Sequence, residues 1–99
     1  VHNLRRWSDG TAEGNSMAAR FDVLRDTSEG GTGQMREDAV TVVDDLTVQL
    51  NASAPDIALV VNMADYPAAV VHRSYAGEDP AANPIGTGAW LPEVNEVGV

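Results

Sequence analysis

The sequence predicts an α+β fold, built from a small, mostly antiparallel sheet and two short helices. Residues 40–50 alternate apolar and polar side chains on either side of two aspartates, a pattern typical of a β-hairpin. Apolar side chains within residues 16–26 recur at helical spacing. Residues 53–63 begin with helix-starting residues and continue as an apolar run. A chain of 99 residues is long enough for one modest core, so we expect a single domain over residues 1–99.

The first half of the chain divides at a strong turn sequence. Residues 1–7 are expected to form a short strand that ends at Ser8-Asp9-Gly10-Thr11. Aspartate bonds to nearby backbone in such turns, and glycine accepts positive φ. Asn15-Ser16 supplies an N-cap for a helix over residues 16–26. Its apolar face carries Phe21, which we expect in the core.

The hairpin is the clearest element of the second half. Residues 40–50 form its two strands, and Asp44-Asp45 forms the turn between them. The next helix is expected to start at Ser53, whose hydroxyl would cap it, and to be largely buried because residues 57–63 are mostly apolar.

The rest of the chain carries weaker signals. A short strand is predicted over residues 68–72 and a loop over residues 75–84. A last extended stretch starts near Ile85 and continues to Val99.

Charge excludes several classes of partner. The chain has 15 acidic and 6 basic residues, all six of them arginine, and a formal net charge of −9. Such a chain repels phosphates, so we expect no nucleic-acid partner and no docking on anionic lipid. The longest apolar run, residues 57–61, is too short to insert directly into a membrane.

The sequence contains no strong catalytic, metal or cofactor motif. Cysteine is absent, and the glycine runs at 30–33 and 86–88 lack the lysine of a phosphate-binding loop. His2 and His72 have no zinc-ligand spacing. We therefore expect no catalytic residue, no metal site and no cofactor. Trp7 and Trp90 could line a ligand cleft, although core packing or partial exposure is the commoner role of such residues.

Four landmarks occur in the order found in one transporter family. They are Leu4-Arg5-Arg6-Trp7-Ser8-Asp9-Gly10-Thr11, the segment 40–50 with its Asp44-Asp45 pair, Tyr66-Pro67-Ala68-Ala69-Val70-Val71, and Asn83-Pro84-Ile85-Gly86-Thr87-Gly88-Ala89-Trp90. The chain resembles the family 5 extracytoplasmic solute-binding proteins of peptide-, oligopeptide- and nickel-type ABC transporters. The residues that match the family pattern are Trp7, Asp9, Gly10, Asp45, Tyr66, Pro67, Pro84, Gly86, Thr87, Gly88 and Trp90.

The resemblance implies a role for a larger protein. The chain would be a fragment of the first lobe of a two-lobed, class II periplasmic-binding-protein-like receptor, located outside the cytoplasm. The intact receptor would be no enzyme; it would capture a peptide or other small solute by lobe closure and deliver it to an ABC permease. Gly86 and Gly88 would let the chain turn tightly. The ligand-contacting residues stay unknown, because most would lie in the other lobe.

Two other functions stay open. One is a stand-alone acidic protein-interaction domain. The less favoured one is a small hydrolase, which requires His72, Ser74 and a carboxylate within hydrogen-bond reach of one another.

Overall fold

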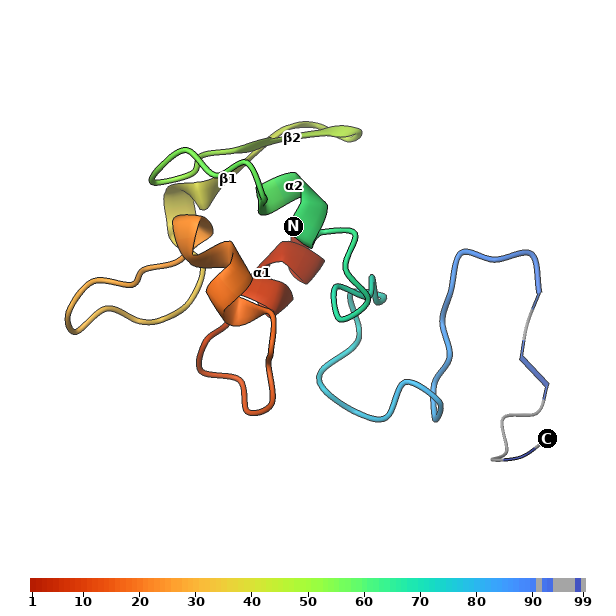
Figure 1. Ribbon diagram of the computed structural model, residues 1–99. Coiled ribbons are helices and arrows are strands. Elements are labelled where there is room, and N and C mark those ends of the chain that lie inside the picture. The colour runs from red at the N-terminus through yellow and green to blue at the C-terminus, as the bar shows by residue number, and fades with distance from the viewer. Residues whose placement is uncertain (91, 94–97, 99) are drawn as a thin grey trace. The chain divides into compact units, whose positions relative to one another are not determined.

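The computed structural model of the protein describes residues 1–90, 92, 93 and 98. The chain forms two compact units, Val1–Ala69 and Val70–Val99. Every helix and strand of the described residues belongs to the first unit (Figure 1). In chain order these elements are α1 (His2–Ser8), the 3₁₀ helices η1 (Ala18–Leu24) and η2 (Glu37–Ala39), the strands β1 (Val40–Asp44) and β2 (Thr47–Leu50), and α2 (Leu59–Asn62).

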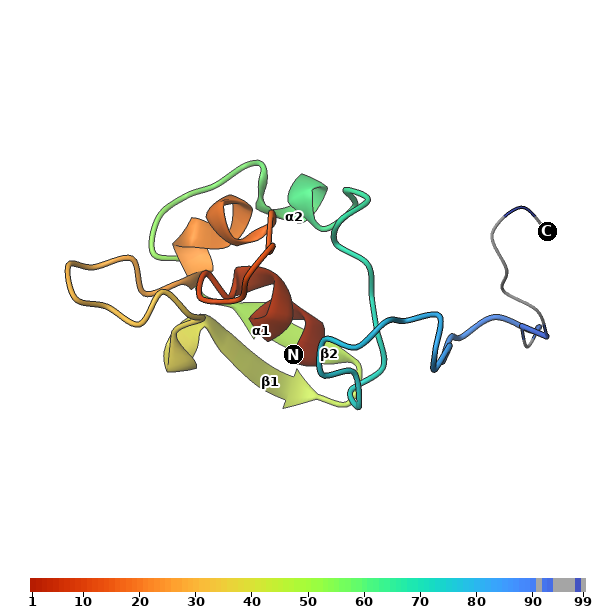
Figure 2. The same cartoon turned by 90° about the horizontal axis from the view of Figure 1, so that it is seen from below.

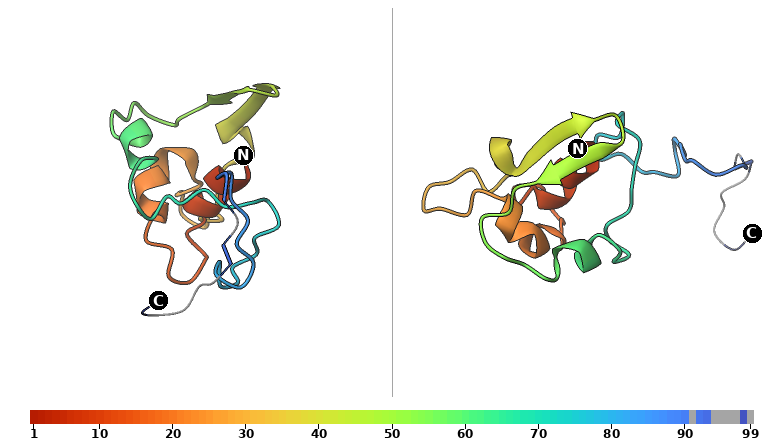
Figure 3. Two further views of the ribbon diagram at one scale, coloured as in Figure 1. Left: turned by 90° about the vertical axis from the view of Figure 1, so that its right-hand side faces the viewer. Right: turned by 90° about the horizontal axis from the view of Figure 1, so that it is seen from above.

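The coarse α+β prediction is confirmed, with a two-stranded antiparallel sheet and a few short helices. Within the first unit, the hairpin of β1 and β2 forms one layer (Figure 2). Viewed from above, it crosses over α1 (Figure 3). Helix η1 contacts both α1 and α2, so the helices form the second layer.

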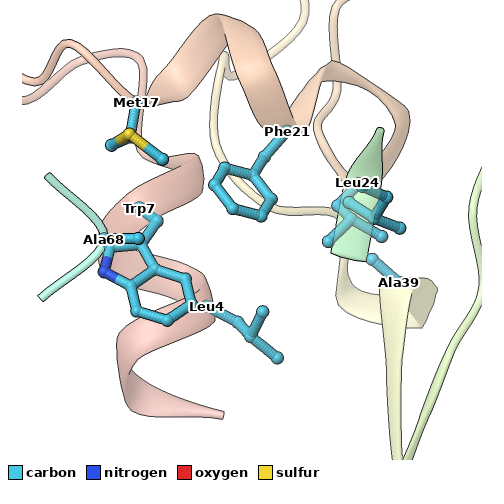
Figure 4. Packing of buried hydrophobic residues seen from close by; sticks show 8 residues of the cluster. Leu4, Trp7, Met17, Phe21, Leu24, Ala39 and Ala68 are labelled. Carbon is cyan, nitrogen blue, oxygen red and sulfur yellow. The ribbon is translucent and has the colours of Figure 1, made fainter. Parts of the chain in front are cut away.

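The core of the first unit collects apolar side chains from α1, η1, η2, α2 and the segment around Ala68. Trp7 stacks on Phe21 with ring centroids 5.8 Å apart, and Phe21 is fully buried, as predicted (Figure 4). The other buried members are Leu4, Met17, Leu24, Ala39, Leu59 and Ala68. Burial of each large apolar side chain in this core contributes about 1.5–3 kcal/mol to the stability of the fold.

The strand predicted over residues 1–7 is wrong, because this segment is the helix α1. Leu4 and Trp7 are three residues apart, which places both on the helix face that enters the core. The buried hydroxyl of Ser8 donates to the carbonyl of Leu4 at 2.6 Å, one helical turn earlier. A strand would point Leu4 and Trp7 to opposite faces and bury only one of them.

The helix predicted over residues 16–26 is confirmed in position but is shorter and tighter. Helix η1 spans Ala18–Leu24 and is kinked at Phe21, where φ is −118° and ψ is 22°. Its predicted apolar face is buried. It ends before Arg25 because that residue is extended and pairs with Met35 in an isolated antiparallel bridge.

The hairpin is confirmed, with Val40 opposite Leu50 and Val42 opposite Val48. Its turn lies one residue later than predicted. Asp44 still pairs with Thr47, so Asp45 and Leu46 are the two loop residues, and the register shifts between Val42 and Asp44. Asp44 Oδ1 accepts the N–H of Leu46 at 2.8 Å, and this bond is the main reason that the pKa of Asp44 is lowered.

The second helix departs from the prediction in its start and its burial. Helix α2 spans only Leu59–Asn62. The side chain that bonds to the backbone just before this helix is Asp56 and not Ser53; Asp56 Oδ1 accepts the N–H of Ala58. Leu59 is buried, but Val60 and Val61 are 73% and 70% exposed. One helical turn presents a single residue to the core here, so an apolar run does not guarantee a buried helix.

The strand predicted over residues 68–72 is wrong, because the described backbone there is neither strand nor helix. The carbonyl of Ala69 instead accepts hydrogen bonds from the side chains of Arg6 and Trp7. This carbonyl is therefore satisfied by side-chain donors and not by the backbone N–H of a neighbouring strand.

The second unit carries no helix or strand among its described residues, which confirms the loop predicted at 75–84. The extended stretch predicted from Ile85 onward is irregular where it is described, and residues 91, 94–97 and 99 lie outside the described residues. Neither Gly86 nor Gly88 has a positive φ, and a Cβ added at Gly88 would meet nothing within 4 Å. Their role in a tight turn of an intact receptor stays a prediction.

Candidate functional site

The first unit has a groove of about 920 Å³ between α1 and the chain that leads into η2. This volume lies within the range of small-molecule sites. The groove is lined by four basic side chains, which are His2, Arg5, Arg6 and Arg36. Its carboxylates are Asp9, Asp26, Glu37 and Asp38. Half of the arginines of this acidic chain therefore meet at one place.

Helix α1 positions the basic side of the groove. Its core face is fixed by Leu4 and Trp7, which leaves His2, Arg5 and Arg6 to line the groove. Arg5 and Arg6 also lie in the last helical turn, where a positive charge opposes the negative end of the helix dipole. The helix that holds the core thus also presents the cations.

Arg36 fixes the opposite side of the groove. One of its terminal nitrogens donates to the carbonyls of Val23 and Asn51 at 3.2 and 2.7 Å. The other forms an ion pair with Asp38 at 2.7 Å. This side chain is only one-quarter exposed and joins three segments of the chain. Its position is therefore set by the fold rather than by solvent.

Three of the four carboxylates already accept hydrogen bonds from the protein. Asp9 accepts the hydroxyl and the N–H of Thr11 at 2.6 and 2.9 Å, and the hydroxyl bond is the main cause of its lowered pKa. Asp26 accepts the hydroxyl of Ser28 at 2.6 Å, which likewise lowers the pKa of Asp26. Asp38 pairs with Arg36.

The loop that carries Asp26 is tied to the turn that carries Asp9. Gly10 donates its N–H to the carbonyl of Gly33 at 2.9 Å, and the Arg25 side chain donates to the same carbonyl at 3.1 Å. A Cβ at Gly10 would lie 2.9 Å from Arg25 Cζ and 3.0 Å from that oxygen. A side chain at this position would therefore displace the Arg25 guanidinium and press on the Gly33 carbonyl oxygen.

The structure brings only some of the family-pattern residues together. Trp7, Asp9 and Gly10 lie at the end of α1, and Trp7 Nε1 donates to the carbonyl of Ala69, in the Tyr66–Val71 landmark, at 3.2 Å. Trp7 is a core residue, so the cleft role considered for it is not its role here.

The other family-pattern residues lie elsewhere in the chain. Asp45 lies in the exposed hairpin turn, and Tyr66 is 91% exposed. Pro84, Gly86, Thr87, Gly88 and Trp90 are exposed and belong to the second unit. None of the eleven is a groove residue except Asp9.

The pair considered for a hydrolase forms a local contact only. His72 Nδ1 lies 2.8 Å from Ser74 Oγ and also accepts the N–H of Ser74 at 3.3 Å. Both side chains are exposed, and among the described residues no carboxylate bonds to either. The contact closes a turn and lacks the third group that orients a catalytic histidine.

The roles of two residues, Asn15 and Arg36, were not predicted from the sequence. Asn15 appears in the sequence as a helix cap, but its amide also donates to the carbonyls of Arg6, Trp7 and Asp9 at 2.7–3.1 Å and so closes the end of α1. The position of Arg36 could not be read from its neighbours in sequence, because the two carbonyls that hold it lie 13 and 15 residues away.

Searches for a metal site, for a membrane-spanning helix and for similar proteins complete the description. Within residues 1–90, 92, 93 and 98, no three His, Asp or Glu side chains gather as a metal site would require. No helix among those residues has the length and apolar character to cross a membrane. Comparison with family models gives no match, and neither does comparison with curated proteins or with solved structures.

Proposed function

We propose that this chain is part of an extracytoplasmic solute-binding protein of an ABC transporter, one that captures peptides or other small solutes. The observation that carries the proposal is the order of four sequence landmarks, from Leu4–Thr11 through to Asn83–Trp90. Each landmark alone is short, but a chance match must reproduce all four in sequence. In this proposal the α+β first unit belongs to one lobe of a class II periplasmic-binding-protein-like fold.

Contacts within two of the landmarks hold their turns in place. Gly10 stands where a side chain would collide with Arg25 and Gly33, and Asp9 bonds to both donors of Thr11. In the hairpin landmark, Asp44 bonds to the backbone of Leu46. These contacts give Asp9, Gly10 and Asp44 a structural role in the turns of their landmarks.

The proposed mechanism is capture without chemistry. The intact receptor closes two lobes around the solute, excludes water, and presents the closed form to a membrane permease. A peptide held through its backbone groups gives broad sequence tolerance. The receptor works outside the cytoplasm and needs no cofactor and no nucleic-acid partner.

Determining the full reading frame tests the proposal. A receptor predicts that the coding sequence continues well past Val99 to a second lobe and that an export signal precedes Val1. Native mass spectrometry of that full-length protein should then show a co-purified small solute. A reading frame confined to these 99 residues, or one that continues into an unrelated domain, would contradict the proposal.

A second candidate is an acidic protein-interaction domain, favoured by the apolar side chains left exposed. Leu46 and Ile57 are 98% and 99% exposed, and Tyr66 and Trp90 are 91% and 92% exposed. Exposed apolar side chains in this number mark interaction surfaces when they are contiguous. This candidate predicts a short complete gene whose product binds a protein partner, whereas the receptor predicts that these side chains are covered by its own remaining chain.

A further inference from the structure

The hairpin leaves backbone groups unpaired along the outer edge of β2. The N–H of Asn51 donates to the carbonyl of Ala39 at 2.8 Å, so these two residues form a hydrogen-bonded pair. Pairing alternates along antiparallel strands, so Val48 and Leu50 turn their N–H and C=O groups away from β1. Among the described residues, no backbone group of another segment bonds to either residue. An extended segment can therefore add to this edge.

β2 also lacks the features that protect edge strands from pairing. Natural edge strands use bulges, charged side chains and prolines for this purpose. β2 has no charged residue and no proline. The irregularity in register lies in β1, between Val42 and Asp44. Of the two edges of the hairpin, that of β2 is thus the one open to a partner.

One face of the hairpin is apolar, and the core covers it only at one end. Val40 and Leu50 pack against the core of the first unit. Val42 and Val48 lie opposite one another on the same face and are 62% and 45% exposed. The other face is polar and carries Gln49. A strand beside β2 would match this hairpin if its residues were alternately apolar and polar.

Charge decides which polar residues fit. From Glu37 to Val71 the chain has acidic residues but no arginine, lysine or histidine. Asp44 pairs with Thr47, which places it on the polar face of the hairpin. A basic side chain on that face of an added strand is attracted by this charge. A second copy of this chain, with its net charge of −9, is repelled.

We propose that the outer edge of β2 binds an extended segment of another protein in which apolar residues alternate with basic ones. The segment pairs antiparallel with β2. Its apolar side chains continue the face of Val48 and Leu50, and its basic side chains lie on the face of Asp44. The proposal rests on the second candidate function, the acidic protein-interaction domain, and names the chemistry of its partner.

Peptide titration of the 99-residue chain followed by NMR tests the site. The probe is acetyl-Val-Arg-Val-Arg-Val-amide, and its match has glutamate in place of both arginines. We expect the arginine peptide to shift the amide signals of residues 47–51, and the glutamate peptide to bind about tenfold more weakly or less. Equal binding of the two peptides, no binding, or shifts confined to other residues would overturn the proposal.

N-methylated peptides test the strand pairing itself. In the antiparallel arrangement, valines opposite Val48 and Leu50 bond to β2 through their own N–H groups, whereas the N–H groups of the arginines point away. N-methylation of the three valines should therefore abolish binding, and N-methylation of the two arginines should preserve it. Equal effects of the two modifications would refute the pairing.

Proline variants assign the edge. Val48→Pro removes an outward N–H of β2, and Val42→Pro removes the matching outward N–H of β1. Proline is tolerated in edge strands where the lost N–H faces solvent, and the signals of the buried Phe21 report whether each variant is folded. Only Val48→Pro should abolish binding of the arginine peptide. Loss of binding in Val42→Pro alone would place the segment on β1 and contradict the proposal.

Two other occupants of the edge would be detected without peptide. Hairpin signals that move on dilution of the chain alone would mean that a second copy binds there. Slow hydrogen exchange of Val48 and Leu50 in the product of a longer reading frame would mean that its own remaining chain covers the edge. Either result would overturn the proposal. The reading frame tests the interaction domain and the peptide tests only this edge, so the two can fail separately.

Discussion

At the scale of single residues, Gly10 lies at a close approach between two loops. The backbone N–H of Gly10 bonds to Gly33, and the Arg25 guanidinium lies against the position that a Cβ would occupy. Gly10→Ala should therefore lower the free energy of unfolding by about 1–3 kcal/mol through overpacking. Denaturant unfolding followed by tryptophan fluorescence measures this loss, because Trp7 is buried in the folded chain whereas Trp90 is already exposed.

The matched control for that change is Gly88→Ala. A Cβ at Gly88 meets nothing within 4 Å, and the residue has no positive φ. The free energy of unfolding should change by no more than about 0.5 kcal/mol. If both variants are equally stable, the close approach at Gly10 is not a constraint on the fold.

The hydroxyl of Thr11 controls the charge state of Asp9. Thr11→Val removes the hydrogen bond that most lowers the pKa of Asp9, so this pKa should rise towards its ordinary value of 3.8. A carboxyl whose pKa is lowered by folding stabilises the protein above the unfolded pKa, and this stabilisation is lost as pH falls through the folded pKa. Thr11→Val should thus reduce the fall in stability on acidification below about pH 4.

The pKa of Asp9 can be followed by NMR titration of its carboxyl carbon. Thr27→Val is the control, because it changes an exposed threonine of the neighbouring loop. An Asp9 pKa that is the same in Thr11→Val and in the parent chain would rule out the hydroxyl as the cause.

At the scale of elements, local sequence predicted hairpins and turns better than helices. The alternation over 40–50 and the turn at Asp9 depend on neighbours in sequence, and both are observed. The strand predicted over 1–7 is wrong because a helix places Leu4 and Trp7 on one face. There they pack in the same core as Met17 and Phe21, which follow the next turn in sequence. Tertiary packing overrides local propensity here.

The end of α1 depends on one amide side chain. Asn15 donates to three carbonyls at the end of the helix and accepts the N–H of Met17 at 3.0 Å. Asn15→Ala should lower the free energy of unfolding by about 1–3 kcal/mol, because those carbonyls lose their partner. Asn15→Asp keeps an acceptor for Met17 but loses the donors, so it should also destabilise the chain.

Thermal unfolding followed by circular dichroism compares these variants with Asn83→Ala, a change at an exposed asparagine of the second unit. We expect that control to unfold like the parent chain. Full stability of Asn15→Asp would show that the acceptor alone matters and that the three carbonyl contacts contribute nothing.

At the scale of the whole molecule, the fold class could be predicted from the sequence, but the groove could not. The groove needs His2 and Arg5 from one helix and Arg36, which lies more than 30 residues further along the chain, and no periodicity connects them. Arg36 is held there by the carbonyls of Val23 and Asn51. The family-pattern residues, by contrast, are recognisable as short runs, but only Asp9 of them reaches the groove.

The core also predicts which part of the chain can fold. All its members lie between Leu4 and Ala68, within the unit Val1–Ala69. A chain that ends at Ala69 should therefore keep the free energy of unfolding of the 99-residue chain to within about 0.5 kcal/mol. It keeps Trp7, which is 5% exposed, and removes Trp90, which is 92% exposed, so its emission should be shifted to the blue.

Phe21→Ala, made in the 99-residue chain and in the chain that ends at Ala69, is the control. It shows whether the assay follows unfolding of this core. Phe21 is fully buried against Trp7, and its truncation should cost about 3–5 kcal/mol in each. Equal losses would show that the same core unfolds in both chains. A shortened chain that has lost cooperative unfolding while the full chain retains it would mean that residues 70–99 contribute stability that the core alone does not account for.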